Sequence, residues 1–118
     1  MAKSADHGLP QKVVAGITGV LAHHANIEKA ILYGSRAMGT HRANSDIDLC
    51  LVGPQLTLTE LLAIETELDD LLLPYKIDLS LQHSIDNPAL LAHIDGVGLE
   101  FWRRGDRPEL ENLRALPP

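Results

Sequence analysis

The strongest constraint on the fold of this chain is the stretch over residues 30–52, where two apolar runs enclose a polar turn. The first run, Ala30-Ile31-Leu32-Tyr33, is apolar on both faces, as in a central strand. Gly34-Ser35 ends this run, and a polar loop leads to the second. Because side chains alternate along a strand, the second run presents Asp46 and Asp48 on one face and apolar residues on the other. The stretch therefore predicts a strand, a phosphate-sized turn and a strand that carries two carboxylates.

A helix is predicted on each side of this stretch. Before it, apolar residues recur at helical spacing after Pro10, a residue suited to the first turn of a helix. After it, Thr57 to Glu60 forms a capping box, and the helix is expected to run to about Leu73, where Pro74 stops it. The predicted apolar stripe of this second helix consists of Leu58, Leu61, Leu62, Leu68, Leu71 and Leu72.

A third strand and a third helix follow. Residues 76–81 alternate polar and apolar side chains, with Asp78 on the polar face. Asn87-Pro88 opens a helix that ends around Gly96 and Gly98. Residues 99–102 form either a last strand or a helical turn, and the charged, proline-rich remainder predicts at most a short helix around residues 108–115.

The alternation of helices and strands is typical of the α/β or α+β class with one sheet. The 118 residues have the size of a single domain, 1–118, with a core expected over about residues 10–102 and a tail over 103–118. No window approaches an apolar membrane span. The only cysteine, Cys50, excludes an intrachain disulfide, and the N-terminus has no apolar signal region. We therefore expect a cytoplasmic protein.

The formal net charge of −6 bears on the class of ligand. Domains that bind nucleic acid usually present a basic face, so nucleic acid is not an expected partner. The negative charge leaves open a phosphate ligand that is bridged to the protein by a metal ion.

Three aspartates carry much of the functional signal. The Cα atoms of Asp46 and Asp48 lie about 6.6–7 Å apart on one face of a strand, and carboxylates at that spacing can bracket hard cations. Asp78 joins them if the third strand lies beside the second with matching faces. Three carboxylates without a cation would repel one another. The simple alternative is a set of solvated aspartates on the open face of a sheet.

Gly34-Ser35 favours the metal-site interpretation. A glycine at a strand end lets the backbone approach a ligand closely. Free N–H groups of the following turn favour phosphate, and the Ser35 hydroxyl adds a donor. Ser35 stands eleven residues before Asp46, and the two features are expected on adjacent strands. Together they predict a site for a nucleotide and its metal.

Gly34-Ser35, ten intervening residues, Asp46-Ile47-Asp48 and the later Asp78 resemble the signature of the DNA polymerase β-like nucleotidyltransferase superfamily. Within it, the run from Ile31 to Leu51 is similar to the minimal nucleotidyltransferases (MNT-type proteins) of bacteria and archaea, and residues 76–98 resemble their C-terminal part. The resemblance covers roughly residues 10–102. It implies the nucleotidyltransferase fold, a small mixed β-sheet with helices packed on one side.

The resemblance also implies roles for the motif residues. The nucleotide-binding set would be Gly34, Ser35 and Arg36, and the catalytic and metal-binding set would be Asp46, Asp48 and Asp78. The metal would be two Mg²⁺ ions, with Mn²⁺ as an alternative, and the substrate would be ATP or another NTP. An acceptor hydroxyl would attack the α-phosphorus in line and release pyrophosphate, with catalysis coming mostly from positioning and charge neutralisation.

Only about forty residues follow Asp78, too few for the acceptor-binding domain of larger superfamily members. MNT-type proteins typically pair with a small helical protein of the HEPN or substrate-binding type, and several are antitoxins that adenylylate the partner. The resemblance thus implies transfer of AMP onto a hydroxyl on, or presented by, such a partner, with the homo- or hetero-oligomeric state left open. Two alternatives remain: a small-molecule, aminoglycoside-like acceptor, and a non-catalytic nucleotide-binding antitoxin that only binds its partner.

Overall fold

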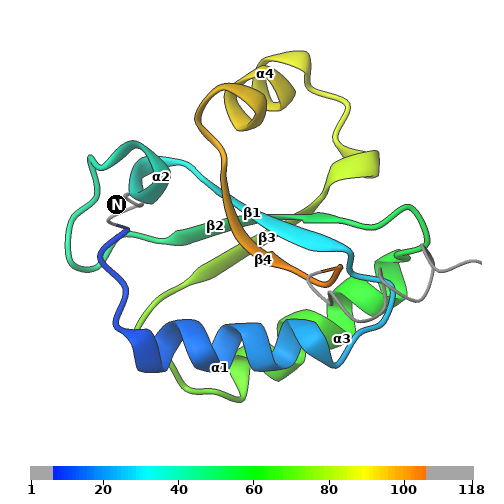
Figure 1. Ribbon diagram of the computed structural model, residues 1–118, viewed down its shortest axis with the longest axis horizontal. Coiled ribbons are helices and arrows are strands. Elements are labelled where there is room, and N and C mark those ends of the chain that lie inside the picture. The colour runs from blue at the N-terminus through cyan, green and yellow to red at the C-terminus, as the bar shows by residue number, and fades with distance from the viewer. Residues whose placement is uncertain (1–6, 106–118) are drawn as a thin grey trace, which may run out of the picture.

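The computed structural model describes residues 7–105, in which four strands form one mixed sheet (Figure 1). The strands are β1 (Lys29–Tyr33), β2 (Ile47–Val52), β3 (Ile77–Leu81) and β4 (Leu99–Arg103), in the order β3-β2-β1-β4. β1 is antiparallel to β2 and β4, whereas β2 and β3 are parallel. The helices are α1 (Gln11–Ala22), α2 (Ser35–Met38), α3 (Leu58–Asp69) and α4 (Pro88–Val97), and a 3₁₀ turn, η1 (Gln82–Ser84), follows β3. The predicted class, α/β with a small mixed sheet, is confirmed.

A large core lies between one face of the sheet and the helices α1 and α3 (Figure 1). Alternation along β1 and β2 sends every second side chain into it, and burying each large aliphatic side chain contributes about 1.5–3 kcal/mol. Its buried residues from these strands and from the two helices are Ala30, Leu32, Ile47, Leu49, Leu51, Val13, Ile17, Val20, Leu21, Ile64 and Leu68. This core fixes β1 and β2, the strands that border the predicted site.

α4 lies on the opposite face of the sheet (Figure 1). A second, smaller core formed by Tyr33, Cys50 and Ile94 holds it there. Its first turn is capped as predicted, because the side-chain oxygen of Asn87 accepts two backbone N–H groups and Pro88 follows. The expectation that the helices pack on one side only is therefore corrected: periodicity identifies the apolar stripe of a helix but not the face of the sheet that the stripe covers.

α3 starts as predicted and ends earlier. The hydroxyl of Thr57 accepts the N–H of Glu60 at 3.1 Å, which is the expected N-cap. The helix ends at Asp69 rather than near Leu73, and the chain turns through Leu72 at φ +55°, a left-handed conformation that breaks the helix.

The face that α3 buries also differs from the prediction. Ile64 and Leu68 are its buried residues, with Leu61 and Leu71 packed against the same core. Leu58 and Leu62, assigned to the apolar stripe, are 66% and 55% exposed, and Leu72 is 88% exposed. Because leucine is abundant in this segment, two sets of apolar residues recur at helical spacing. The set that includes Ile64 is the one that packs into the core.

Arg104 ties the end of the described chain to the end of α1. Its guanidinium donates hydrogen bonds of 2.9–3.2 Å to the backbone carbonyls of Leu21, Ala22, His24 and Ile27. These bonds tie the residue after β4 to the last turn of α1 and to the loop that follows it. The fold therefore continues past the predicted core boundary at residue 102, while the helix predicted around residues 108–115 lies outside the described residues.

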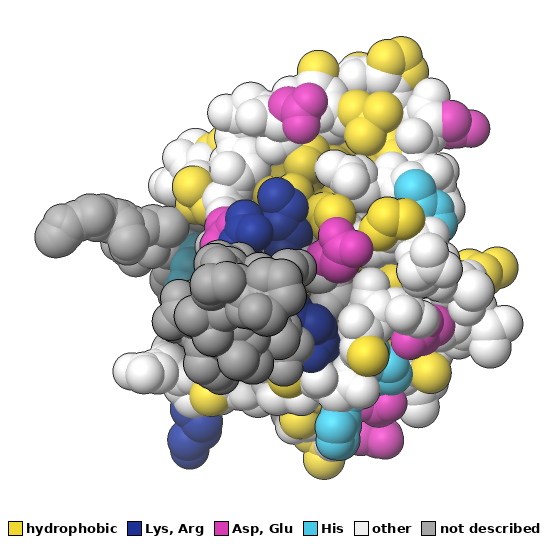
Figure 2. Space-filling model, turned by 45° about the vertical axis from the view of Figure 1, so that its right-hand side comes forward, with side chains coloured by type: hydrophobic (Ala, Val, Ile, Leu, Met, Phe, Trp, Pro, Cys, Tyr) yellow, Lys and Arg dark blue, Asp and Glu magenta, His cyan; other side chains and the backbone are white. Residues whose placement is uncertain are grey.

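Charged side chains of both signs are mixed on the face drawn in Figure 2, and apolar side chains gather in the part where α4 lies. On the α1–α3 side, His24 Nε2 lies 3.0 Å from a carboxylate oxygen of Glu67 and joins the two helices. Within residues 7–105, no helix combines the length and the apolar character that crossing a membrane requires.

Candidate active site

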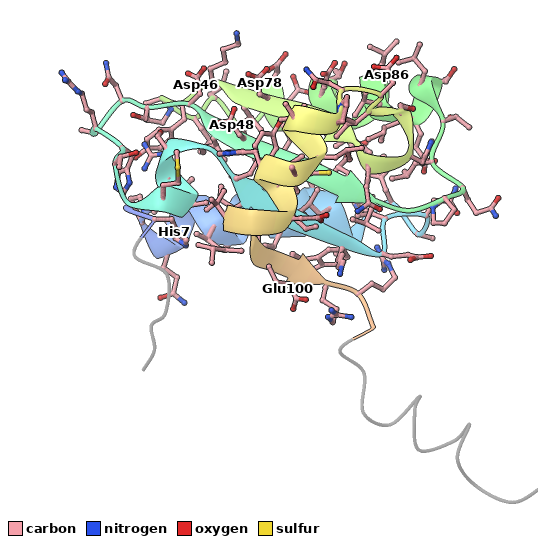
Figure 3. The ribbon with its side chains drawn as sticks, turned by 90° about the horizontal axis from the view of Figure 1, so that it is seen from above. His7, Asp46, Asp48, Asp78, Asp86 and Glu100 are labelled. Carbon is pink, nitrogen blue, oxygen red and sulfur yellow. The ribbon has the colours of Figure 1, made fainter. Side chains whose placement is uncertain are left out.

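Asp48 and Asp78 are neighbours on the parallel strands β2 and β3. The register pairs Ile47 with Ile77 and Asp48 with Asp78, so the two aspartates point to the same face from strands about 4.8 Å apart. Asp46 directly precedes β2 and lies close by (Figure 3). The structure therefore sets Asp48 beside Asp78, with Asp46 nearby, because the third strand lies beside the second with matching faces.

Negative charge is concentrated at this end of the sheet. Burial, followed by the charges of Asp78 and Asp46, raises the pKa of Asp48, while Lys76 opposes the rise. On the same face, the Tyr33 hydroxyl is 3.2 Å from the hydroxyl of Ser80, and mainly burial raises the pKa of Tyr33. Tyr33 is therefore neutral and does not offset the repulsion between the carboxylates. A bound cation would relieve that repulsion.

The chemistry of these donors fits Mg²⁺. Mg²⁺ is usually held by one or two carboxylates together with water and the phosphate oxygens of a substrate, so it needs no closed cage of protein ligands. In the part of the chain that the structure describes, no group of three or more His, Cys, Asp or Glu side chains is arranged to hold a metal ion by itself. Asp46 and Asp78 are exposed and Asp48 is half-buried, an open arrangement that suits an ion arriving with a phosphate.

Gly34 joins β1 to α2 in a conformation that is essentially restricted to glycine, with φ +76° and ψ −156°. A Cβ atom at this position would collide with Oδ2 of Asp48. Its N–H donates a hydrogen bond to Nε2 of His93 at 3.2 Å. The turn therefore lies directly against the carboxylate site, as predicted, but the amide of Gly34 already has a protein partner.

Ser35 is the first residue of α2 and is half-buried at the edge of the site. Its backbone carbonyl accepts the N–H of Thr40 at 3.0 Å, which closes the turn. Among residues 7–105, its side-chain hydroxyl has no hydrogen-bond partner, so the hydroxyl is available to a ligand.

Arg36 is not placed to bind a phosphate. Its side chain is only 1% exposed, and its guanidinium lies 5.1 Å from the ring centre of Tyr75. The guanidinium donates hydrogen bonds of 2.8–3.4 Å to the backbone carbonyls of His7, Arg42, Ala43 and Ser45. The predicted contact with the triphosphate is therefore corrected: Arg36 points inward and holds the loop that delivers Asp46.

His93 is a site residue that sequence reasoning missed. It extends from α4 to Gly34, and its ring meets the ring of Tyr33 edge-on, with centroids 6.1 Å apart and planes at 81°. The sequence placed it beside Ile94 in a predicted helix, within the segment that resembles the C-terminal part of the MNT-type proteins. That placement could not reveal the contact, because it depends on which face of the sheet α4 covers.

A pocket of about 300 Å³ opens between α3 and the start of β3, and Asp78 is the one predicted site carboxylate that lines it. Its lining includes Glu65, Asp69, Tyr75, Lys76 and Asp78. Its apolar lining, Leu68, Leu73 and Ile77, belongs to the large core that α3 covers, so most of the pocket lies on the opposite face of the sheet from Asp48.

A family model described as "Polymerase beta, Nucleotidyltransferase" matches residues 16–105 of the chain. The match spans the whole sheet, the Gly34-Ser35 turn and the three aspartates. Among curated proteins, no sequence matches this chain at a significant level.

Solved structures of toxin–antitoxin pairs contain chains with a similar fold. A toxin–antitoxin with AMP-PNP gives a TM-score of 0.64 at 22% identity, over 86% of this chain and 82% of that chain. The toxin–antitoxin MntA-HepT gives 0.61 at 20% identity, over 89% and 82%. The tri-AMPylated HEPN toxin of Shewanella oneidensis in complex with MNT antitoxin gives 0.61 at 19% identity, over 88% and 81%. At these identities the likeness establishes the shared fold.

Proposed function

Because the chain belongs to the polymerase beta family of nucleotidyltransferases, we propose that it moves AMP from ATP onto an acceptor hydroxyl. The observation that carries this proposal is the register that sets Asp48 beside Asp78, directly against Gly34. β1 and β2 are antiparallel, so the Gly34-Ser35 turn at the end of one strand adjoins the carboxylates at the start of the other. A phosphate-binding turn and a carboxylate cluster in contact are what a metal–nucleotide site requires.

The residues would divide the work as follows. The Ser35 hydroxyl and the turn around it bind the triphosphate, and the set that holds Mg²⁺ is Asp46, Asp48 and Asp78. When bound, Mg²⁺ neutralises phosphate charge and favours ionisation of the acceptor hydroxyl. The acceptor oxygen forms a bond to the α-phosphorus, the bond from that phosphorus to the bridging oxygen breaks, pyrophosphate leaves, and the hydroxyl proton is released to solvent.

We further propose that a small helical protein of the HEPN type presents the acceptor, in the cytoplasm. Support comes from the similar fold of an MNT antitoxin solved with a tri-AMPylated HEPN toxin.

Label transfer from α-³²P-ATP tests the proposal. The full chain and its co-expressed partner are incubated with Mg²⁺, and wild type is compared with Asp48→Asn and Asp78→Asn. We expect the wild type to label the partner. Each variant should label it at least about 100-fold more slowly, because each substitution removes a carboxylate charge proposed to hold the Mg²⁺ that neutralises the reacting phosphate. Asp70→Asn is the matched control, since this exposed carboxylate lies outside the site.

Co-purification separates catalysis from assembly, because the partner should bind wild type and both site variants equally. If the complex forms but wild type labels nothing, the proposed activity is wrong and the chain is a binding module. If the label appears on an added aminoglycoside and not on the partner, the acceptor is a small molecule instead.

A further inference from the structure

The centre of the candidate site contains a side chain to which neither the sequence motif nor the proposed mechanism gives a role. His93, on α4, accepts the N–H of Gly34 through Nε2 at 3.2 Å. We propose that His93 is a positioning residue for nucleotide binding: its neutral imidazole fixes the turn from which Ser35 meets the triphosphate. The inference rests on the proposed function and deepens it.

The Gly34 amide needs such a partner because the β-sheet does not supply one. The ladder between β1 and β2 ends with the pair Tyr33 and Asp48, so the N–H of Gly34 lies beyond the last strand pair. An amide at the edge of a buried site costs free energy if it lacks a hydrogen bond. The His93 imidazole can accept this bond only through an unprotonated nitrogen, which assigns Nε2 as the acceptor and leaves the proton on Nδ1.

The helix that carries His93 is well anchored. Ile94, the next residue, is 3% exposed and packs with Tyr33 and Cys50. At the C-terminal end, the N–H of Gly98 donates to the carbonyl of Ile94 at 2.8 Å. The imidazole is therefore presented from a fixed position rather than from a loop.

Gly34 is consequently held from two sides. On one side the carboxylate of Asp48 leaves no room for a Cβ atom, and on the other His93 holds the N–H. Ser35 follows directly, so the direction of its hydroxyl depends on how this glycine is oriented. Removing the acceptor atom of His93 should loosen the turn and weaken the binding of the triphosphate.

The opposite role for His93 predicts the opposite result. If a phosphate oxygen took the N–H of Gly34 for itself, His93 would compete with the nucleotide, and removing its acceptor atom would tighten binding. The sign of the change in nucleotide affinity therefore distinguishes a positioning residue from a competitor.

The test measures the Kd for MgATP by calorimetry, with the full chain and no acceptor. His93→Leu removes the acceptor atom, whereas His93→Gln can return an oxygen near the position of Nε2. We expect His93→Leu to raise the Kd about tenfold, as for a lost hydrogen bond, and His93→Gln to remain within about threefold of wild type. The matched control is His83→Leu, since His83 Nε2 bonds to the carbonyl of Leu56 at 3.0 Å, away from the site, and its loss should leave the Kd unchanged.

Tighter binding by His93→Leu, or an unchanged Kd, would overturn the inference. A wild type that binds no MgATP would instead overturn the proposed function. If His93→Leu does not fold, ¹⁵N spectra of the wild-type ring decide: Nε2 is expected to stay unprotonated and bonded to Gly34 when MgATP binds, and loss of that bond in the complex contradicts the positioning role.

Discussion

Replacing Gly34 with alanine separates a functional requirement for glycine from a purely conformational one. The residue has φ +76° and ψ −156°, and an added Cβ atom would meet Oδ2 of Asp48. Gly39, at the end of α2, also has a positive φ of +77°, but a Cβ atom there has nothing within 4 Å. The pair therefore offers two substitutions with a similar backbone cost, of which only one touches the site.

The conformational cost can be compared directly. At Gly34 the backbone lies in a region that side chains rarely adopt, worth about 1–3 kcal/mol, and at Gly39 the left-handed conformation costs about 1–2 kcal/mol. Each substitution should lower the midpoint of thermal unfolding by several degrees in a domain of this size. Only Gly34→Ala should also displace the carboxylate of Asp48.

The assay combines urea unfolding with the Kd for MgATP. Both variants should lose about 1–3 kcal/mol in the free energy of unfolding. We expect Gly34→Ala to raise the Kd by at least about tenfold, equivalent to the 1.4 kcal/mol of one lost contact, and Gly39→Ala to stay within about twofold. If Gly34→Ala folds and binds MgATP as well as Gly39→Ala does, the contact between the turn and Asp48 has no part in nucleotide binding.

Three further substitutions test other parts of the structure. Arg36→Met should lower the free energy of unfolding in urea by about 3 kcal/mol or more, because four carbonyls lose their donor. Arg36→Lys should not restore the lost stability. A loss below about 1 kcal/mol in Arg36→Met would contradict the structural role of Arg36. The folded protein raises the pKa of Asp48, so the wild type loses stability as the pH rises above the ordinary value of 3.8. In EDTA at about pH 7, Asp48→Asn should therefore have a higher melting temperature than the wild type. The difference should vanish at about pH 3 and shrink when Mg²⁺ is added. Leu72→Asn should stabilise the protein to urea by about 0.5–1 kcal/mol, since this exposed residue has φ +55°; no gain would show that the turn is unstrained.

Local periodicity predicted the helices, the strands and the class of the fold, whereas the mixed sheet and the joining of Asp78 to the other two aspartates were implied by the resemblance to the nucleotidyltransferases. Alternation along residues 76–81 placed Asp78 on the polar face of its strand, and the parallel pairing of β3 with β2 then set it beside Asp48. The caps at Thr57 and Asn87 were equally local, since each involves residues within three positions along the chain.

Features that depend on distant segments could not be predicted in the same way. Arg36 follows the Gly-Ser pair and looked like a phosphate ligand, but carbonyls of His7 and of residues 42–45 surround its guanidinium. Periodicity likewise could not choose between the two apolar sets of α3 or assign α4 to a face of the sheet. The contact of His93 with Gly34 could not be predicted either, because it depends on the sheet face that α4 covers and joins residues 59 positions apart.

The division of the apolar residues between two cores has a consequence for local unfolding. α4 is held by the small core of Tyr33, Cys50 and Ile94, whereas β1 and β2 also share the large core with α1 and α3. Detaching α4 exposes much less apolar surface than global unfolding, so its amide hydrogens should exchange with solvent at a lower free energy than those of the central strands. Detachment would also break the bond between His93 and Gly34. The attachment of α4 to the sheet and the binding of nucleotide would then be thermodynamically coupled. A bound nucleotide would slow amide exchange in α4 even without touching that helix.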